Sequence, residues 1–405
     1  MSQLEERQLW RMLVLPFAAG YFLSYLFRTV NAVIGPKIAT ELELGDNALG
    51  LLTSTYFLAF GAAQLPLGML LDRFGPRRVE AALLVVAACG AAVFAMADGL
   101  GGLASGRALI GLGVSACLMA SFKAFSQWFP VERHASLTGW IMASGGLGAL
   151  AAAKPLELAL GFADWREIVF ALAALTLLVA GLIGRSVPDK PLEGEKHGWQ
   201  EQLAGVASIF RSGHFWRYAP MGFWSTGGFM AVQGLWASRW MSELEHMSSG
   251  EIAARLTWIS GAMLGGYLFM GVFAALLGRR GVKLETLYLS AMVLGLLSFA
   301  GIALQPGHGS TLLWSLLGAC FSLSNISYSL VARAFPPALS GRANTAFNLF
   351  VFAGAFGLQW GIGALVDALR ACGLATDAAY RSAFIALLCG QLLALAWLLW
   401  SGRRR

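Results

Sequence analysis

Four cations of this chain lie inside long apolar segments, where an ionisable side chain is costly and is a candidate for function. They are Arg28, Arg107, Lys123 and Lys154. At 1.5 Å per residue, Arg28 and Lys154 each lie about 9 Å from the centre of their segment and toward the same end, with Arg107 somewhat further out. Lys123 lies toward the opposite end. Three cations therefore share one layer of the N-terminal half.

No carboxylate has a comparable predicted depth, because Glu80, Glu157 and Asp367 all lie near the ends of apolar segments. An unpaired buried cation is expensive, so such groups either line water or bind an anion from solution. A guanidinium offers a fork of donors to the oxygens of a carboxylate, nitrate or phosphate. We therefore predict that Arg28 binds an anionic substrate.

Each of the other three cations has an alternative role. Arg107 could bond to backbone carbonyls and support local helix packing, and Lys123 could extend to lipid headgroups. Lys154 could reach the membrane surface or pair with Glu157, about one helical turn away. Arg28 is therefore the preferred anion ligand.

The composition indicates which elements must position these residues. Of the 405 residues, 57% are hydrophobic and 13% are charged, against about 25% charged in a typical soluble domain. A helix needs about 20 apolar residues to cross a bilayer. Twelve stretches meet this need: 9–34, 48–71, 79–97, 103–127, 136–160, 168–184, 218–240, 256–277, 284–304, 311–332, 343–368 and 382–400. The predicted fold class is an all-α polytopic membrane protein with 12 transmembrane helices, which excludes a soluble enzyme and a nucleic-acid partner.

The net charge of +7 is distributed unevenly among the loops. With the N-terminus inside, 19 Lys and Arg residues fall on the cytoplasmic side, 6 outside and 4 within the segments. Short cytoplasmic loops carry an excess of these residues. We therefore expect a multi-pass protein of a bacterial-type inner (plasma) membrane, with both termini cytoplasmic.

The longest loop divides the chain into an N-terminal set of helices (1–184), a cytoplasmic linker (185–217) and a C-terminal set (218–405). The linker carries Trp199, Leu203, Val206 and Phe210 at helical spacing, which predicts an amphipathic helix on the membrane surface. The loops after the second and eighth stretches, and the Phe-Pro pairs at 129–130 and 335–336, repeat at one offset of 206 residues. This repetition predicts two pseudo-symmetric six-helix bundles.

One loop motif connects this architecture to a known family. The run Gly68-Met-Leu-Leu-Asp-Arg-Phe-Gly-Pro-Arg-Arg78 resembles the motif G-x-x-x-D-R-x-G-R-[RK] of the major facilitator superfamily, with Pro76 at the first basic position. Arg107-Ala-Leu-Ile-Gly-Leu-Gly113 is similar to the R-x-x-x-G-x-G of that family. The resemblance covers essentially the whole chain and implies the fold of two six-helix bundles.

The resemblance also implies a gate at this loop. Asp72 is expected to hold the two halves together by facing the N-terminus of the eleventh helix, and to release it as the protein changes state. Gly278 stands at the position of the acid in the second half, so the gate is expected to be asymmetric. In that family, the position that corresponds to Arg107 is often assigned to proton coupling. The predicted coupling or gating residues are Asp72, Arg73, Gly75, Arg77, Arg78, Arg107 and Arg133.

In this family helices 1, 4, 7 and 10 line a central cavity, which would place Arg28 there. Tyr25 and Asn31 share its helix and could hold its side chain. Polar residues well inside the seventh and tenth helices could bind the substrate or join helices. The predicted substrate-binding residues are Arg28, Lys154, Tyr25, Asn31, Gln233, Asn325 and Tyr328.

Other chemistry is not indicated by the sequence. The five Cys are scattered and odd in number, and the five His lie in loops without metal-ligand spacing. No Walker-type phosphate-binding loop is present, so ATP is not the expected energy source. We expect no catalytic residues, no metal and no cofactor, and the protein is not expected to be an enzyme. The antiporter pattern G-P-x-x-G-G is not reproduced, which argues against a drug/proton antiporter.

These patterns predict a secondary active transporter that moves a small organic or inorganic anion by alternating access, by proton-coupled symport or by anion exchange. The expected partners are the anion, protons as a possible coupling ion and the lipid bilayer, and a monomer is expected. Two alternatives stay open. One is efflux of amphipathic metabolites or drugs through a cavity lined by aromatic residues, and the other is a non-transporting membrane sensor on the same fold.

Overall fold

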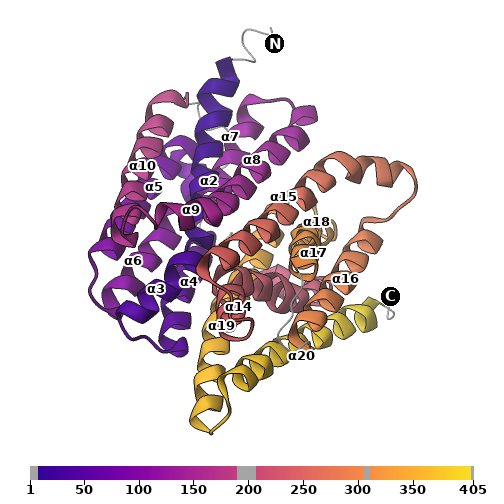
Figure 1. Cartoon of the computed structure of the whole chain (residues 1–405). Coiled ribbons are helices and arrows are strands. Elements are labelled where there is room, and N and C mark those ends of the chain that lie inside the picture. Colours follow the sequence, from indigo (N-terminus) through magenta and orange to yellow (C-terminus); the bar gives the residue numbers. More distant parts are fainter. Residues whose placement is uncertain (1–7, 189–206, 305–310, 403–405) are drawn as a thin grey trace.

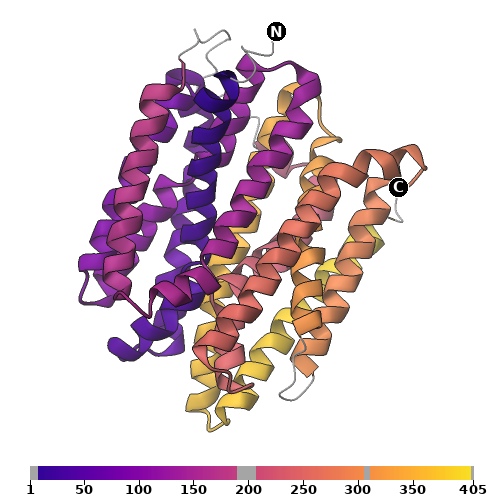
Figure 2. The ribbon, with the colours of Figure 1, turned by 45° about the horizontal axis from the view of Figure 1, so that its top comes forward.

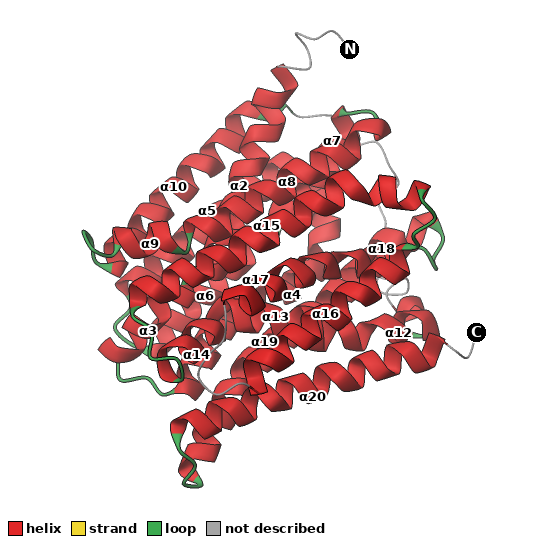
Figure 3. Ribbon diagram, turned by 45° about the vertical axis from the view of Figure 1, so that its right-hand side comes forward, coloured by secondary structure: helices red, strands yellow, loops and turns green. Residues whose placement is uncertain are grey.

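The computed structural model describes residues 8–188, 207–304 and 311–402, and the regular structure in these ranges is helical (Figure 3). Within these ranges the helices form twelve passes along the bundle. The first six are η1 (Trp10–Val14) with α2 (Leu15–Thr29) and α3 (Asn31–Glu41), α4 (Asp46–Phe74), α5 (Pro76–Met96), α6 (Leu100–Gly113) with α7 (Cys117–Trp128), α8 (Val131–Ala151) with α9 (Lys154–Ala159), and α10 (Trp165–Ser186).

The second six passes follow the same plan. Pass seven consists of α12 (Gly213–Met221), η2 (Gly222–Gly227), α13 (Gly228–Ala231), η3 (Val232–Trp236) and α14 (Ala237–Glu243). The others are α15 (Ser249–Arg279), α16 (Leu284–Leu304), α17 (Thr311–Ser322) with η4 (Leu323–Asn325) and α18 (Ile326–Ala332), α19 (Pro337–Ala371), and α20 (Thr376–Gly402).

The predicted transmembrane stretches agree with these passes. Among the described residues, nine helical stretches are long and apolar enough to cross a membrane, and α4 is a tenth that bends by 56° between Gln64 and Pro66. The first pass extends beyond the predicted end at 34 because the chain turns at Val30 and continues as α3. Most of the predicted amphipathic linker helix lies outside the described residues.

The predicted repeat has a counterpart in backbone geometry. Gly75 and Gly281, which are 206 residues apart, both adopt a left-handed backbone, with φ of 80° and 83°. A residue with a Cβ atom adopts this conformation only at a cost, so glycine is favoured at both turns. Pro130 and Pro336, at the same offset, both precede the first residue of a helix, α8 and α19 respectively.

The helices of the first and last six passes form two groups that lie side by side (Figure 1). The groups meet mainly where α4 packs along α19 and α8 packs along α15. We call the end of the bundle that carries the α3–α4 and α19–α20 turns the Asp46 face, and the opposite end, with the α4–α5 turn, the Asp72 face. The first described helix begins and the last one ends at the Asp72 face (Figure 2).

Passes one, four, seven and ten are all interrupted. Turns break pass one at Val30 and pass four at 114–116, π-helical segments interrupt pass seven, and a 3-10 segment interrupts pass ten. Such interruptions free backbone groups and are frequent at functional sites. They occur in the four helices that the sequence resemblance places around the central cavity, and also in pass five, between α8 and α9.

Candidate functional site

Arg28 lies between the two groups of helices, two residues before the break at Val30. Its side chain is buried, with 8% exposed. The guanidinium carbon is 4.5 Å from the ring centre of Tyr25, 5.3 Å from that of Phe60 and 5.6 Å from that of Phe352. Aromatic faces of both groups of helices thus support the cation, and its Nε has no hydrogen-bond partner.

Polar side chains of the C-terminal helices reach the same region. The hydroxyl groups of Tyr25 and Tyr267, on α15, are 3.1 Å apart. Asn325 lies beside Tyr267 in the interrupted tenth pass and is exposed. Tyr328 donates to Asn348 Oδ1 at 2.6 Å and lies within electrostatic reach of Arg28. The structure therefore brings Arg28, Tyr25, Asn325 and Tyr328 together around one site.

Two further predicted ligands are nearby but buried. Gln233 donates to Met263 Sδ at 3.6 Å, and the next residue, Gly234, lies beside the backbone oxygen of Arg28. Asn31 is 1% exposed, and neither of its side-chain polar atoms has a hydrogen-bond partner. Asn31 therefore does not hold the side chain of Arg28, because its amide makes no hydrogen bond in this structure. Its role in substrate binding stays a prediction.

Lys154 is not part of this site. Its Nζ lies 2.7 Å from Glu157 Oε2, and both side chains are near Gly250 at the start of α15, on the Asp46 face. Its backbone N–H donates to Thr257 Oγ1 at 3.1 Å. The expected layer of three unpaired cations is thus reduced, and Lys154 adopts the alternative pairing that the sequence left open.

Arg107 has a structural contact of its own. It is buried, donates from Nη1 to the backbone oxygen of Phe27 at 2.8 Å, and lies over the ring of Tyr56 at 4.8 Å. Phe27 immediately precedes Arg28, so Arg107 ties the fourth pass to the interrupted part of the first. This contact is the carbonyl bond considered as its alternative role.

At the Asp72 face, the loop motif is organised around Asp72. Lys123 Nζ lies 2.8 Å from Asp72 Oδ1, and the two side chains are 36% and 44% exposed. Lys123 thus binds a carboxylate rather than extending to headgroups. Asp72 contacts a residue of its own half, whereas the sequence analysis expected it to face the N-terminus of α19.

The remaining motif residues form the turns of this face. Arg73 lies over the ring of Phe74, and Arg77 donates from Nε to the backbone oxygen of Gly184 at 2.9 Å. Arg78 is in the first turn of α5 and Arg133 in the first turn of α8.

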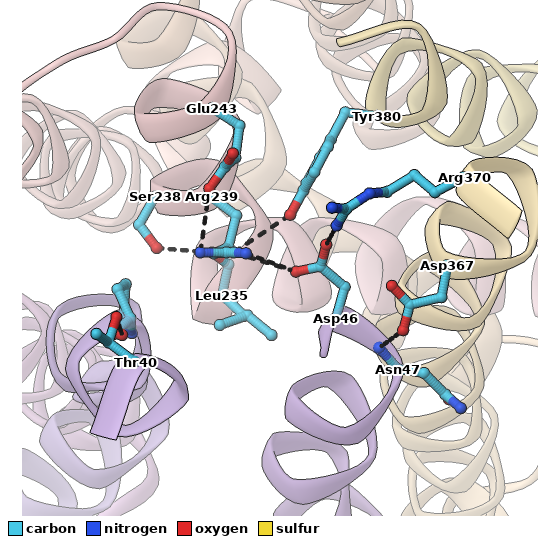
Figure 4. Close-up of polar contacts among 11 residues, drawn as sticks. Thr40, Asp46, Asn47, Leu235, Ser238, Arg239, Glu243, Asp367, Arg370 and Tyr380 are labelled. Carbon is cyan, nitrogen blue, oxygen red and sulfur yellow. Dashed lines mark hydrogen bonds and ion pairs between the residues drawn. The ribbon is translucent and has the colours of Figure 1, made fainter. Parts of the chain in front are cut away.

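The Asp46 face carries an ion-pair network between the two halves (Figure 4). Asp46, the first residue of α4, is buried with 1% of its side chain exposed. Arg239 of α14 donates to Asp46 Oδ1 from Nη2 at 2.8 Å and from Nε at 3.2 Å. Arg370 of α19 lies 3.7 Å from Asp46 Oδ2, and the hydroxyl of Tyr380 accepts from Arg239. One acid of the N-terminal half therefore meets two arginines of the C-terminal half.

Neighbouring contacts extend this closure along α4 and α19. Asp367 Oδ2 accepts from the backbone N–H of Asn47 at 2.8 Å, so an acid of α19 faces the N-terminus of α4 (Figure 4). Deeper in the bundle, Gln359 donates to the hydroxyl of Thr53. A Cβ atom on Gly363 would lie 2.3 Å from the backbone oxygen of Asp46, so the two helices are in direct backbone contact there.

Sequence reasoning missed these residues at both locations. Tyr56, Tyr267 and Phe352 look like ordinary core aromatics in sequence. Asp46 and Arg239 lie near segment ends, where charges are common, and are separated by 193 residues. The available signal was the acid at the first position of α4, which favours a contact near a helix N-terminus.

The sequence profile of the Major Facilitator Superfamily matches residues 17–358. The chain belongs to this family. The family membership predicted from the loop motif is confirmed.

Several curated relatives are named as transporters of acidic compounds. The Hexuronate transporter of Escherichia coli (strain K12) is 26% identical over 281 residues, 64% of this chain and 64% of that protein. The Probable sulfoacetate transporter SauU of Cupriavidus necator is 26% identical over 203 residues, 47% of each chain. The Galacturonate transporter of Dickeya chrysanthemi is 26% identical over 171 residues, 42% of this chain and 49% of the relative. The matches thus span less than two thirds of each relative.

Solved structures share the fold. A bacterial homologue of the human lysosomal transporter Spinster, in an inward-facing and unoccupied conformation, has a TM-score of 0.76 at 16% identity and covers 96% of both chains. The xylose transporter XylE of E. coli, in a partially occluded inward open conformation, has a TM-score of 0.73 at 15% identity, again over 96% of both chains. These similarities confirm the predicted twelve-helix fold class.

Proposed function

We propose that the protein is a secondary active transporter that moves a small organic anion of the acid-sugar class by alternating access. The observation that carries the proposal is the environment of Arg28. Its guanidinium lies between the two halves on aromatic faces, and no carboxylate among the described residues pairs with it. An anion from solution would supply the missing partner.

The groups around Arg28 suit an anion that also carries hydroxyl groups. Tyr25, Tyr267 and Asn325 present hydroxyl and amide groups that both donate and accept hydrogen bonds. Tyr25 and Tyr267 bond to each other in this structure, and a substrate hydroxyl inserted between them would replace that bond. The hexuronate and galacturonate named for the relatives are carboxylates with several hydroxyls, which is consistent with this arrangement.

The number of available cations favours a single negative charge on the substrate. Lys154 is paired with Glu157, Lys123 with Asp72, and Arg107 is bound to a backbone oxygen. Of the four cations inside the apolar segments, Arg28 is then the one available to bind a ligand. A monocarboxylate therefore matches the site better than a dicarboxylate or a phosphate ester.

The two faces of the bundle are assigned to the two sides of the membrane and to the closing steps of the transport cycle. We infer a bacterial-type inner membrane, with both termini and the Asp72 face cytoplasmic, because the Lys and Arg excess lies there. The Asp46 network would close the opposite side in this conformation, and Asp72 would gate the cytoplasmic side when the protein changes state. We propose that the protein acts as a monomer.

Ligand-dependent thermal stabilisation of the purified protein tests the central claim. Galacturonate and glucuronate are expected to raise the unfolding temperature of the wild type, and Arg28→Ala is expected to abolish this rise. Lys154→Ala is the matched control, because its cation lies outside the site, and it should respond like the wild type. Normal stabilisation of Arg28→Ala by either anion would show that the site is elsewhere.

A further inference from the structure

The carboxyl group of Glu80 is enclosed inside the N-terminal helices. Glu80 lies on α5, one turn after Pro76, and is 0% exposed. Neither of its oxygens has a nitrogen or oxygen hydrogen-bond partner among the described residues, and the thiol of Cys117, a weak donor, is its polar neighbour. An ionised carboxylate without a partner or water is among the most costly groups to bury. Glu80 was placed near a segment end by the sequence, and the structure surrounds it with protein.

Three helices close around this carboxyl group. A Cβ atom on Gly20 of α2 would lie 2.3 Å from Glu80 Oε1 and 3.7 Å from Ile183 of α10. The carboxyl group therefore occupies the space of the missing Gly20 side chain and reaches the backbone of α2. The thiol of Cys117, on α7, is a polar neighbour. Glu80 thus contacts the first and fourth passes, which carry Arg28 and Arg107.

The charged groups of the surrounding helices are engaged elsewhere or exposed. Arg77, three residues before Glu80 on α5, donates to the backbone oxygen of Gly184. Exposed residues include Arg73, Arg78, Glu167 and Arg185. The engaged residues are Arg107 with Phe27, Lys123 with Asp72, Arg166 with Glu41 and Asp46 with Arg239. Arg28 lies over the ring of Tyr25, in the site proposed for the anion. Among the described residues, no cation therefore forms an ion pair with Glu80 that would balance an ionised carboxylate.

We propose that Glu80 is a proton-binding site and carries the coupling proton of the anion transport proposed above, on which this inference rests. The carboxylate gains one proton from one side of the membrane and returns it to the other side, while the anion crosses in the same cycle. The O–H bond is the one bond that forms and breaks. One proton with one monovalent anion makes the cycle electroneutral.

The position of Glu80 supplies a physical link between the two events. Gly20 and Arg28 lie on one helix, about 12 Å apart along its axis at 1.5 Å per residue. The close packing of Gly20 on the carboxyl group accommodates the protonated acid, whereas the ionised form requires water or a partner. Protonation therefore favours the packing of α2 against α5, and the position of α2 determines the position of Arg28.

Transport of labelled galacturonate into proteoliposomes tests the inference with Glu80→Gln, which resembles the protonated acid. For one proton per anion, an inward gradient of about one pH unit supports about tenfold accumulation by the wild type. Glu80→Gln is expected to show no gradient-driven accumulation, an inside-to-outside ratio of about one, while counterflow exchange without a gradient continues. Glu157→Gln is the matched control, and it should accumulate like the wild type.

The possible outcomes separate this inference from the proposed function. Accumulation by Glu80→Gln at the wild-type ratio would overturn the role of Glu80. A wild type that exchanges galacturonate but ignores the pH gradient would also overturn it, yet would leave anion transport intact. A wild type without any exchange of acid sugars would instead refute the proposed substrate class.

If Glu80→Gln does not fold, Glu80→Asp provides the second measurement. It keeps the acid and shortens it by one methylene group, so gradient-driven accumulation is expected to persist with a shifted pH dependence. A pH profile of uptake identical to that of the wild type would count against titration of Glu80.

Discussion

The two faces of the bundle place acidic residues in opposite situations. At the Asp46 face, a buried acid of one half is bound by arginines of the other half, and Asp367 faces the N-terminus of α4. At the Asp72 face, the acid of the family motif is 44% exposed and binds Lys123 of its own half. The same pair of helices, α4 and α19, thus has an acid near each end.

This difference indicates how the protein holds the Asp46 face closed and leaves the Asp72 face able to close in another conformation. Removing one partner of a buried ion pair leaves an uncompensated charge and costs about 3–5 kcal/mol, whereas an exposed pair is worth about 0–1 kcal/mol. The Asp46 pairs can therefore hold the halves together. The Asp72 pair can exchange its partner at little cost when α19 approaches.

The largest effect is expected from Arg239→Ala. This substitution leaves the buried Asp46 carboxylate with Arg370 as the remaining arginine of the network. A loss of about 3 kcal/mol corresponds to about a 150-fold shift toward an open Asp46 face. Spin labels at Glu43 and Leu374, both exposed on this face, would report the separation of the halves by electron-spin distance measurement in a background without native cysteines.

Arg166→Ala is the matched control for this experiment. Arg166 pairs with Glu41 at the same face, but both belong to the N-terminal half. The distance distribution between the labels should not change in this variant. An unchanged distribution in Arg239→Ala as well would contradict the assignment of the network as a closure between the halves.

A smaller effect is expected from Gln359→Leu. The substitution removes the hydrogen bond to Thr53 across the α4–α19 contact and retains the backbone oxygen that accepts from Trp236. One hydrogen bond is worth about 1 kcal/mol, so the open fraction should rise about fivefold in the same distance measurement. A response as large as that of Arg239→Ala would mean that the hydrogen bonds, not the ion pairs, dominate closure.

Asp367→Asn should change the open fraction still less. The amide oxygen can still accept from Asn47, and only the favourable charge at the helix N-terminus is lost, which is worth about 0.5 kcal/mol or about twofold. Asp367→Ala, which removes the acceptor too, should exceed it. Equal effects of the two variants would show that the charge is the whole contribution.

The smallest effect is expected from Lys123→Met at the other face. Because the Asp72 pair is exposed, the unfolding temperature and the separation of the Asp46 face should stay close to wild type.

Asp72→Asn, by contrast, should keep anion binding and slow transport, since it removes the acid proposed to gate α19. Faster or unchanged galacturonate uptake by Asp72→Asn would refute that gating role.

The sequence predicted the fold well because each pass is encoded locally. About 20 apolar residues specify a membrane helix. The two loops and the Phe-Pro pairs that repeat at one offset predicted the internal repeat. The first pass was predicted too short since Val30 begins a turn within continuous helical chain, which hydropathy does not register.

The site was predicted in part. Arg28 was identifiable because a cation in an apolar segment contrasts with its neighbours. Tyr267 and Phe352 were not, because an aromatic residue that faces a ligand has the same sequence pattern as one that packs in a core. Lys154 and Glu157 were ambiguous, because the spacing allows a pair without requiring one. Glu80 was underestimated, because its burial comes from α2 and α10, which are distant in sequence.

The backbone contact at Gly363 has a practical consequence for studying the protein. Because this glycine lies against Asp46, a branched side chain such as valine at position 363 would act as a steric wedge that excludes the arrangement described here. Such a variant would populate the opposite conformation without disturbing any charge. It would offer a route to conformation-specific antibodies and to a second structure of the cycle.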